Sequence, residues 1–195
     1  FIDRRYDCAD FRLVCVLRSL CDFSGLISEE MLSRMKRTVL GFKYAMDEPG
    51  RDSMCYWSEN HQLIFAACEY LAGQLYPEET FTNNGRTGRQ HMQKAQAPLE
   101  RWFEERFTLG FTEWHSNTYY EEDAAPLSLL IDCARDPHIA SRAAMLLDLL
   151  LLDMALHSFE GFSSAASGRC YERQKKDPKA QDTLDIAAKA FGFAR

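Results

Sequence analysis

The sequence predicts an all-α protein built from antiparallel helical hairpins. Apolar side chains recur at the three-to-four-residue spacing of helices along about seven segments, and they almost nowhere alternate with polar ones as in a half-buried strand. Residues that cap helices stand at the starts of most of these segments. Very short links between some segments alternate with long polar links, and a short link makes its two helices antiparallel neighbours.

The composition is that of one globular domain over residues 1–195. Apolar residues make up 46% and charged residues 27% of the chain, which is ordinary for a folded protein of this length. The net charge of −6 gives no electrostatic reason to expect a nucleic-acid partner, because phosphate backbones need a basic face. A membrane partner is not expected either, since the densest apolar segment, 143–156, is too short to span a bilayer.

The first three helices follow from apolar spacing and from their caps. The first is expected from about Asp10 to Phe23. Ser28 is a preferred N-cap residue and opens a second helix that runs to about Tyr44. Ser58 opens a third helix, whose apolar residues form a continuous stripe.

Two capping boxes predict the starts of the fourth and fifth helices. In this motif the N-cap side chain and the side chain three residues later each satisfy a free backbone N–H group. Thr87 with Gln90 fits the motif for the fourth helix, and Thr118 with Glu121 fits it for the fifth. The fifth helix is expected to run to about Ala134.

The last two helices lie in the final third of the chain. Asp136 and Pro137 start the sixth, because proline costs no hydrogen bond at the first helical position. A seventh, weaker helix is expected between Pro178 and Ala190.

Three long links separate the hairpins, at 45–57, 109–117 and 159–177. If the helices alternate in direction, all three links emerge at the same end of the protein. Loops held by a rigid scaffold commonly carry chemistry, so this end is expected to hold the functional site. Its candidate residues are Trp57, Glu59, Asn60, His61, Glu113, Trp114, His115, Tyr119, Tyr120, Arg169 and Tyr171.

Some of these side chains suit proton transfer beside a bound carboxylate. Asn60 and His61 fall in a first helical turn, where free N–H groups favour negative charge; the alternative is that they only satisfy the helix end. Tyr119 and Tyr120 can act as proton carriers near a positive group, or can simply pack. Arg169 can hold a carboxylate through two parallel hydrogen bonds, or can be a solvated surface residue.

The two tryptophans among the candidates can serve either a ligand or the core. Trp57 and Trp114 can stack on sugar rings, or can plug the core beside a helix start. His115 is a second candidate proton carrier, and Tyr171 accompanies the arginine in the third link.

No metal or other cofactor is expected. The chain has neither a His-Glu-x-x-His motif nor an EF-hand loop, and its five histidines are dispersed. Seven cysteines, an odd number with no Cys-x-x-Cys pair, indicate buried free thiols in a reducing compartment such as the cytoplasm.

The pair Asn60–His61, with Tyr119 downstream and Arg169 close by, resembles the α/α-toroid polysaccharide lyases of the alginate and chondroitin lyase type. Residues 56–173 are also similar to bacterial and fungal proteins of uncharacterised activity. The resemblance implies helical hairpins that form part of an α/α toroid. It also implies β-elimination on an oligosaccharide or polysaccharide that contains uronic acid.

The resemblance assigns each residue a role in that reaction. Asn60 would neutralise the sugar carboxylate, and Arg169 would help to hold it. His61 or Tyr119 would remove the neighbouring proton. Tyr119 would then protonate the departing glycosidic oxygen.

Two other functions remain open from the sequence. A toroid glycoside hydrolase would pair Glu113 with Asp123 or Glu59, and a helical-repeat binding module would need no reacting group. Seven helices do not close a toroid and both ends of the sequence look cut. The rest of a parent chain is therefore an expected partner.

Overall fold

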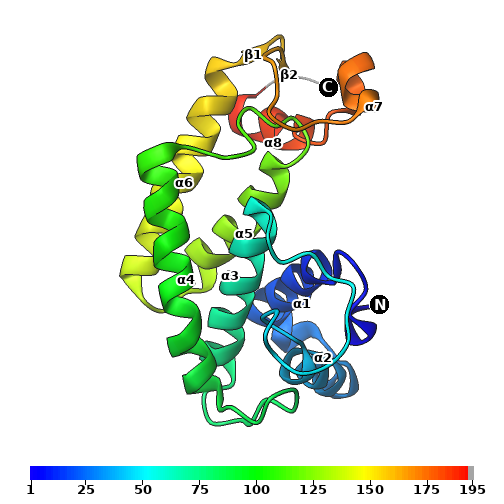
Figure 1. Ribbon diagram of the computed structural model, residues 1–195, viewed down its shortest axis with the longest axis vertical. Coiled ribbons are helices and arrows are strands. Elements are labelled where there is room, and N and C mark those ends of the chain that lie inside the picture. Colours follow the sequence, from blue (N-terminus) through cyan, green and yellow to red (C-terminus); the bar gives the residue numbers. More distant parts are fainter. Residues whose placement is uncertain (193–195) are drawn as a thin grey trace.

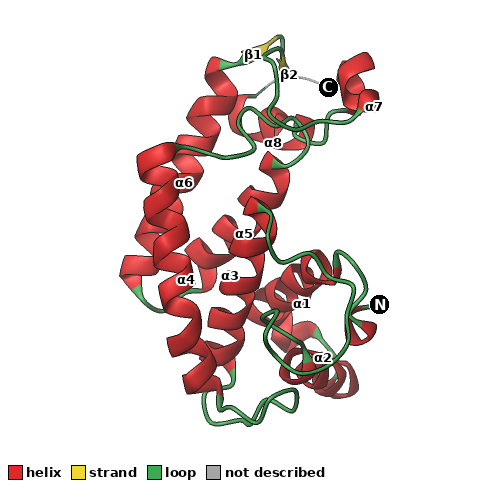
Figure 2. Ribbon diagram, viewed as in Figure 1, coloured by secondary structure: helices red, strands yellow, loops and turns green. Residues whose placement is uncertain are grey.

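The computed structural model describes residues 1–192 and is mostly helical (Figures 1 and 2). The predicted all-α class is confirmed. The α-helices of the described residues are α1 (Ala9–Phe23), α2 (Glu29–Gly41), α3 (Glu59–Leu75), α4 (Gly88–Leu109), α5 (Tyr120–Cys133), α6 (Pro137–Leu156), α7 (Glu172–Lys176) and α8 (Leu184–Phe191). Three short 3-10 turns and a two-stranded hairpin complete the fold, at Ile2–Arg4, Ser24–Leu26, Pro178–Ala180, β1 (Ser158–Phe159) and β2 (Phe162–Ser163).

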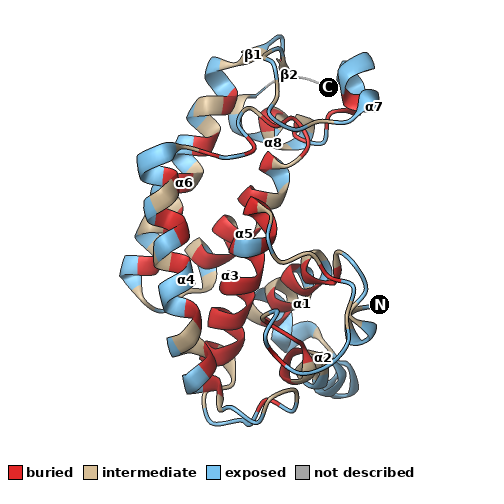
Figure 3. Ribbon diagram, viewed as in Figure 1, coloured by how far each residue is buried: buried red, intermediate tan, exposed pale blue. Residues whose placement is uncertain are grey.

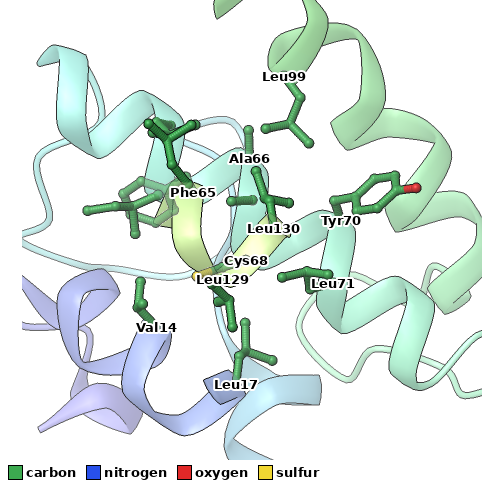
Figure 4. Close-up of a cluster of buried hydrophobic side chains, with 14 of the residues drawn as sticks. Val14, Leu17, Phe65, Ala66, Cys68, Tyr70, Leu71, Leu99, Leu129 and Leu130 are labelled. Atoms are coloured by element: carbon green, nitrogen blue, oxygen red, sulfur yellow. The ribbon is translucent and has the colours of Figure 1, made fainter. Parts of the chain in front are cut away.

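Helix α3 is the centre of the core. Every residue from Glu59 to Gln74 except Gln62 is buried, and a helix covered on all sides must lie inside the fold. Figure 3 shows this helix buried along its length, between helices that are each partly exposed. Its neighbours are α4, α5 and α1. Figure 4 shows side chains of α1, α4 and α5, among them Leu17, Leu99 and Leu130, gathered around α3.

Helices α3 and α4 touch closely where the first ends and the second begins. A Cβ atom on Gly73 would lie 2.4 Å from the carbonyl oxygen of Gly88, and one on Gly88 would lie 2.1 Å from that of Tyr76. Only glycine leaves room for such backbone contact. These two glycines therefore set how tightly this pair of helices packs.

Most predicted helix starts are confirmed. Ser28 accepts a hydrogen bond from the backbone N–H of Met31, and Asp136 caps α6 with proline at its first turn. The capping box of Thr87 and Gln90 is present in full. Local sequence decides these starts, because each cap and the N–H group that it satisfies are only two or three residues apart.

The second predicted capping box is wrong. Helix α5 begins at Tyr120, and the hydroxyl of Thr118 donates to Asn117 Oδ1 instead of capping the helix. Ser116 Oγ satisfies the backbone here instead, because it accepts hydrogen bonds from the N–H groups of Thr118 (3.4 Å) and Tyr119 (3.0 Å). A serine turn therefore replaces the predicted box.

Helix α2 ends at Gly41, three residues before its predicted end, and this changes the path of the first long link. The N–H group of Thr82 donates to the carbonyl of Leu40 (2.8 Å), so α2 ends beside the α3–α4 connection. The link to α3 must then run back along the protein to Ser58, as the cyan trace of Figure 1 shows. The prediction that this link lies wholly at the functional end is wrong, and only its last residues reach that end.

The C-terminal part of the chain differs from prediction in three ways. The short helix α7 lies within the predicted link 159–177. The predicted helix at 178–190 is a 3-10 turn at Pro178–Ala180 followed by α8, which packs against α6. The hairpin of β1 and β2 was not predicted. Its two turn residues, Glu160 and Gly161, both have positive φ (49° and 85°), as the tightest hairpin turns require.

Helix α6 leaves an apolar stripe uncovered. Its members recur at helical spacing and are all exposed: Met145, Leu149, Leu152 and Leu156. Such a surface is what a further helical layer would cover. A closed toroid stays a prediction.

All seven cysteines are free thiols. Only Cys68 is buried and Cys15 is exposed, so the expectation that these thiols are buried is wrong for most of them. Within residues 1–192, no helix has the length and apolar character needed to cross a membrane.

The close contact of α3 with α4 predicts that replacing Gly73 by alanine lowers the stability of the protein. Gly73→Ala should destabilise the protein by about 1–3 kcal/mol, because the added methyl group forces packed backbones apart, although alanine is the better helix former. Gly25→Ala is the matched control, since a Cβ there meets nothing within 4 Å. Urea unfolding of both variants measures the difference. Equal stability of the two would contradict the close contact.

Candidate functional site

The carboxylate of Glu59 joins the start of α3 to the end of α4 and to the link that follows it. Its Oε2 lies 2.6 Å from Arg106 Nη1 and accepts a hydrogen bond from the N–H of Thr112 (2.5 Å). Its Oε1 accepts from the N–H of Glu113 (3.3 Å). The backbone carbonyl of Glu59 accepts from Trp102 Nε1 (3.0 Å). Glu59 is therefore a structural anchor and not a free substrate ligand.

The link between α4 and α5 also binds the segment that contains Gly168 and Arg169. Glu113 Oε1 lies 2.8 Å from Arg169 Nη1, and Ser116 Oγ donates to the carbonyl of Arg169 (2.7 Å). The N–H of Gly168 donates to the carbonyl of Trp114 (2.8 Å), and the indole lies directly against that glycine. The predicted meeting of the second and third links with the start of α3 is thereby borne out by hydrogen bonds.

Two tyrosines and an arginine lie together at this end. The hydroxyls of Tyr119 and Tyr171 are hydrogen-bonded to each other, and the guanidinium of Arg169 lies 4.1 Å from the centre of the Tyr119 ring. Burial and the hydrogen bond to Tyr171 raise the pKa of Tyr119. Hydrogen bonds from Tyr119 and Arg169 lower the pKa of Tyr171. The pair therefore has one phenol that keeps its proton and one that gives it up more easily.

Asn60 and His61 occupy the first turn of α3 as predicted, but they point into the protein. Asn60 is fully buried, and its Oδ1 accepts from Ser58 Oγ (2.5 Å) and from the N–H of His61 (2.9 Å). The His61 ring is stacked on Phe11 (4.7 Å between centres), and its Nδ1 lies 2.5 Å from Asp10 Oδ2. The expectation that Asn60 meets a sugar carboxylate is wrong for this conformation, because no solvent reaches it.

Glu122 lies in the first turn of α5. Its charge interacts with those of Asp10 and His61. Burial, then the negative charges of Glu121 and Asp10, raise its pKa to about 7, while His61 opposes the shift. Such a carboxyl group changes its charge near neutral pH.

The carboxylates expected for a glycoside hydrolase do not face an open site. Asp123 is fully buried, and neither of its oxygens has a hydrogen-bond partner in the described residues. Burial, with the nearby charges of Glu59 and Glu113, raises its pKa well above the ordinary range. Glu59 and Glu113 are each paired with an arginine. None of the three is free to act on a glycosidic bond in this arrangement.

The remaining candidates divide between the surface and the interior. Trp57 and Trp114 are exposed, at 68% and 47%, and can offer flat apolar faces to a ligand. Tyr120 is buried, and its hydroxyl donates to Asp153 Oδ2 (2.6 Å) and accepts from the N–H of His115 (2.8 Å). It therefore fixes the link in place. His115 turns away from the tyrosine pair toward α6, where its ring is stacked on His157.

The sequence did not reveal the residues that pair with the candidate site residues and fix their positions. Arg106 sits in a helix whose charged residues all look solvated, and Asp10 lies in an apolar helix without a polar neighbour in sequence. Only the Asp153/His157 pair carried a local signal, because residues four apart on a helix share a face. The other missed residues have no sequence neighbour that reveals their partner.

Comparison with known proteins does not add to this geometry. No family model, curated protein or solved structure matches the chain. The interpretation of the site therefore depends on its own contacts, charges and burial.

Removing the Glu59 charge should be costly. Glu59→Gln leaves Arg106 buried without its main counter-ion, and breaking such a pair costs about 3–5 kcal/mol. Glu79→Gln is the matched control, because Glu79 pairs with Lys36 on the surface and exposed pairs contribute about 0–1 kcal/mol. Chemical unfolding measures both. A Glu59 variant no weaker than the control would show that the anchor is dispensable.

Glu122 should make stability depend on pH. Between pH 4.5 and 7 the unfolded chain loses the Glu122 proton while the folded protein keeps it. The free energy of unfolding therefore falls over this range and levels off above pH 7. Glu122→Gln should gain stability relative to wild type across the same range, as unfolding curves at several pH values would reveal. Glu172→Gln on exposed α7 should show no such gain, and a flat difference for Glu122→Gln would disprove the assignment.

Proposed function

We propose that this protein is a carbohydrate-active enzyme, a polysaccharide lyase that cleaves a glycan containing uronic acid by β-elimination. The observation that carries the proposal is the hydrogen-bonded pair of Tyr119 and Tyr171 beside Arg169. The environments of the two phenols push their pKa values apart. Two neighbouring groups with separated pKa values are what a reaction needs when it both removes and supplies a proton.

Arg169 is the proposed binder of the sugar carboxylate. Its Nη1 is held by Glu113, whereas its Nη2 lies toward the Tyr171 hydroxyl (3.4 Å). A guanidinium fixed on one side can offer its remaining N–H groups to a carboxylate oxygen. The bound carboxylate would bring the carbon next to it toward the two phenols. The exposed face of Trp114, packed on Gly168 beside the arginine, suits the adjoining sugar ring.

The proposed reaction divides the proton transfers between the tyrosines. Tyr171, as the phenolate, takes the proton from the carbon that bears the carboxylate. The electron pair of that C–H bond forms the new carbon–carbon double bond, and the bond from the next carbon to the glycosidic oxygen breaks. Tyr119 gives its proton to this oxygen. The hydrogen bond between the hydroxyls then returns a proton from Tyr171 to Tyr119, which restores both groups.

This assignment changes the roles that the family resemblance implied. The proton acceptor, which the resemblance gave as His61 or Tyr119, becomes Tyr171, and Asn60 has no contact with the substrate. His61 and Asp10 lie inside the fold, where their charges act on the pKa of Glu122. The hydrolase alternative loses support because Asp123 is buried and Glu59 is tied to Arg106. The binding module stays open, since exposed tryptophans serve either function.

The tyrosine pair gives a direct test. Tyr171→Phe and Tyr119→Phe should each lower the rate of elimination by about 10²–10⁴-fold, the usual contribution of one positioned proton carrier. Tyr6→Phe is the matched control, because Tyr6 is an exposed tyrosine near the N-terminus and should keep wild-type activity. The assay follows the near-ultraviolet absorbance of the new conjugated double bond during incubation with uronic-acid polysaccharides.

Other outcomes would point elsewhere. New reducing ends without ultraviolet absorbance would identify a hydrolase. Binding of the polysaccharide without any product would identify a binding module. Full activity of Tyr171→Phe would remove Tyr171 as the proton acceptor even if the protein is a lyase.

A further inference from the structure

Two histidines and an aspartate meet at the end of α6, on the side of the 110–119 link away from the tyrosine pair. The rings of His115 and His157 are stacked with their centres 3.8 Å apart. Asp153 Oδ1 lies 3.4 Å from His115 Nε2 and 3.2 Å from His157 Nδ1. One potential ligand atom from each residue lies within 4.8 Å of the other two. The histidines are therefore not all dispersed, contrary to the expectation from the sequence.

The hydrogen bonds around His157 suit a metal ligand. Its Nδ1 lies 2.8 Å from the main-chain carbonyl oxygen of Asp153 and must donate to it. This fixes the proton on Nδ1, so Nε2 is the ring nitrogen that can bind a metal ion. Ligating histidines commonly show this arrangement, in which the other ring nitrogen donates to a carbonyl or a carboxylate.

His115 is held by its backbone in an uncommon conformation. Its φ is +51°, a left-handed value that few residues other than glycine adopt. Its N–H donates to the hydroxyl of Tyr120 and its carbonyl accepts from Ser167 Oγ, each at 2.8 Å. The same Tyr120 hydroxyl donates to Asp153. One buried tyrosine thus positions two of the three potential ligands.

A second cluster of similar composition has its negative charge balanced by a lysine. Glu48, Glu69 and His91 also bring ligand atoms together in the buried core. There, however, Lys94 Nζ lies 2.7 Å from Glu48 and 2.8 Å from Glu69 and supplies the positive charge. Among the described residues, no lysine or arginine is paired with Asp153. Within residues 1–192, its carboxylate has the two imidazoles and Tyr120 as its side-chain partners.

We propose that His115, Asp153 and His157 bind a divalent transition-metal ion, with zinc as the best match. Two imidazoles and one carboxylate are a common donor set for zinc, and they leave one position for water. The three side chains are 23–35% exposed and line a small cavity with Asn117, Ser158 and Thr183. An ion and its water can therefore reach them. None of the three ligands belongs to the tyrosine group, so the metal site does not depend on the proposed function.

Zinc titration by calorimetry tests the site. The wild-type protein should bind zinc, and His115→Gln and His157→Gln should each weaken binding at this site by at least about tenfold, since even supporting residues matter by about 10–100-fold. His138→Gln is the matched control, because His138 lies on the same helix α6, is exposed and is outside the cluster. It should bind as wild type does. Circular dichroism of every variant checks that the helices persist.

Cobalt separates this site from zinc bound by the free cysteines. A cobalt ion held by nitrogen and oxygen gives visible bands without the strong near-ultraviolet band of a thiolate ligand. The expected result is those visible bands in wild type and in His138→Gln, and their loss in His115→Gln. Binding of wild-type strength in both cluster variants, or a cobalt spectrum of thiolate type only, would overturn the proposal.

Discussion

The arrangement of the functional end depends on one buried charge, the carboxylate of Glu59. It stands in the first turn of α3, where the free N–H groups of the helix favour a negative charge. A buried carboxylate is costly unless it is paired and hydrogen-bonded. Arg106 from α4 and the backbone N–H groups of Thr112 and Glu113 meet that requirement. In doing so they fix the end of α4 and the start of the next link against α3, the most buried helix.

The link between α4 and α5, residues 110–119, contributes side chains to two faces of the protein. On one face, Glu113 and Tyr119 hold and stack against Arg169, which brings Tyr171 into place. On the other face, His115 turns toward α6 through its left-handed backbone and meets His157. The proposed catalytic group and the proposed metal site thus share one anchored segment. Each rests on residues that the other does not use.

Burial decides which acidic groups near this segment are chemically available. Asp123 lies so deep, beside Glu59 and Glu113, that its pKa is raised well above the ordinary range. Glu122 is next to it in sequence but less buried, and its pKa of about 7 leaves it able to change charge. Adjacent carboxyl groups on one helix therefore differ in behaviour because they face different surroundings. Composition alone cannot distinguish them.

The sequence by itself determined the helices and many of their ends. Apolar periodicity and local caps such as Ser28, Asp136 and the Thr87–Gln90 box depend on residues a few positions apart, so a single chain reveals them. It also indicated that Arg169 and the 109–117 link lie together, because short hairpin links restrict where long links emerge. Only the tertiary structure decided that Asn60 and His61 face the interior, and that His115 pairs with His157. Those outcomes depend on burial and on contacts between distant segments, which no local pattern of residues records.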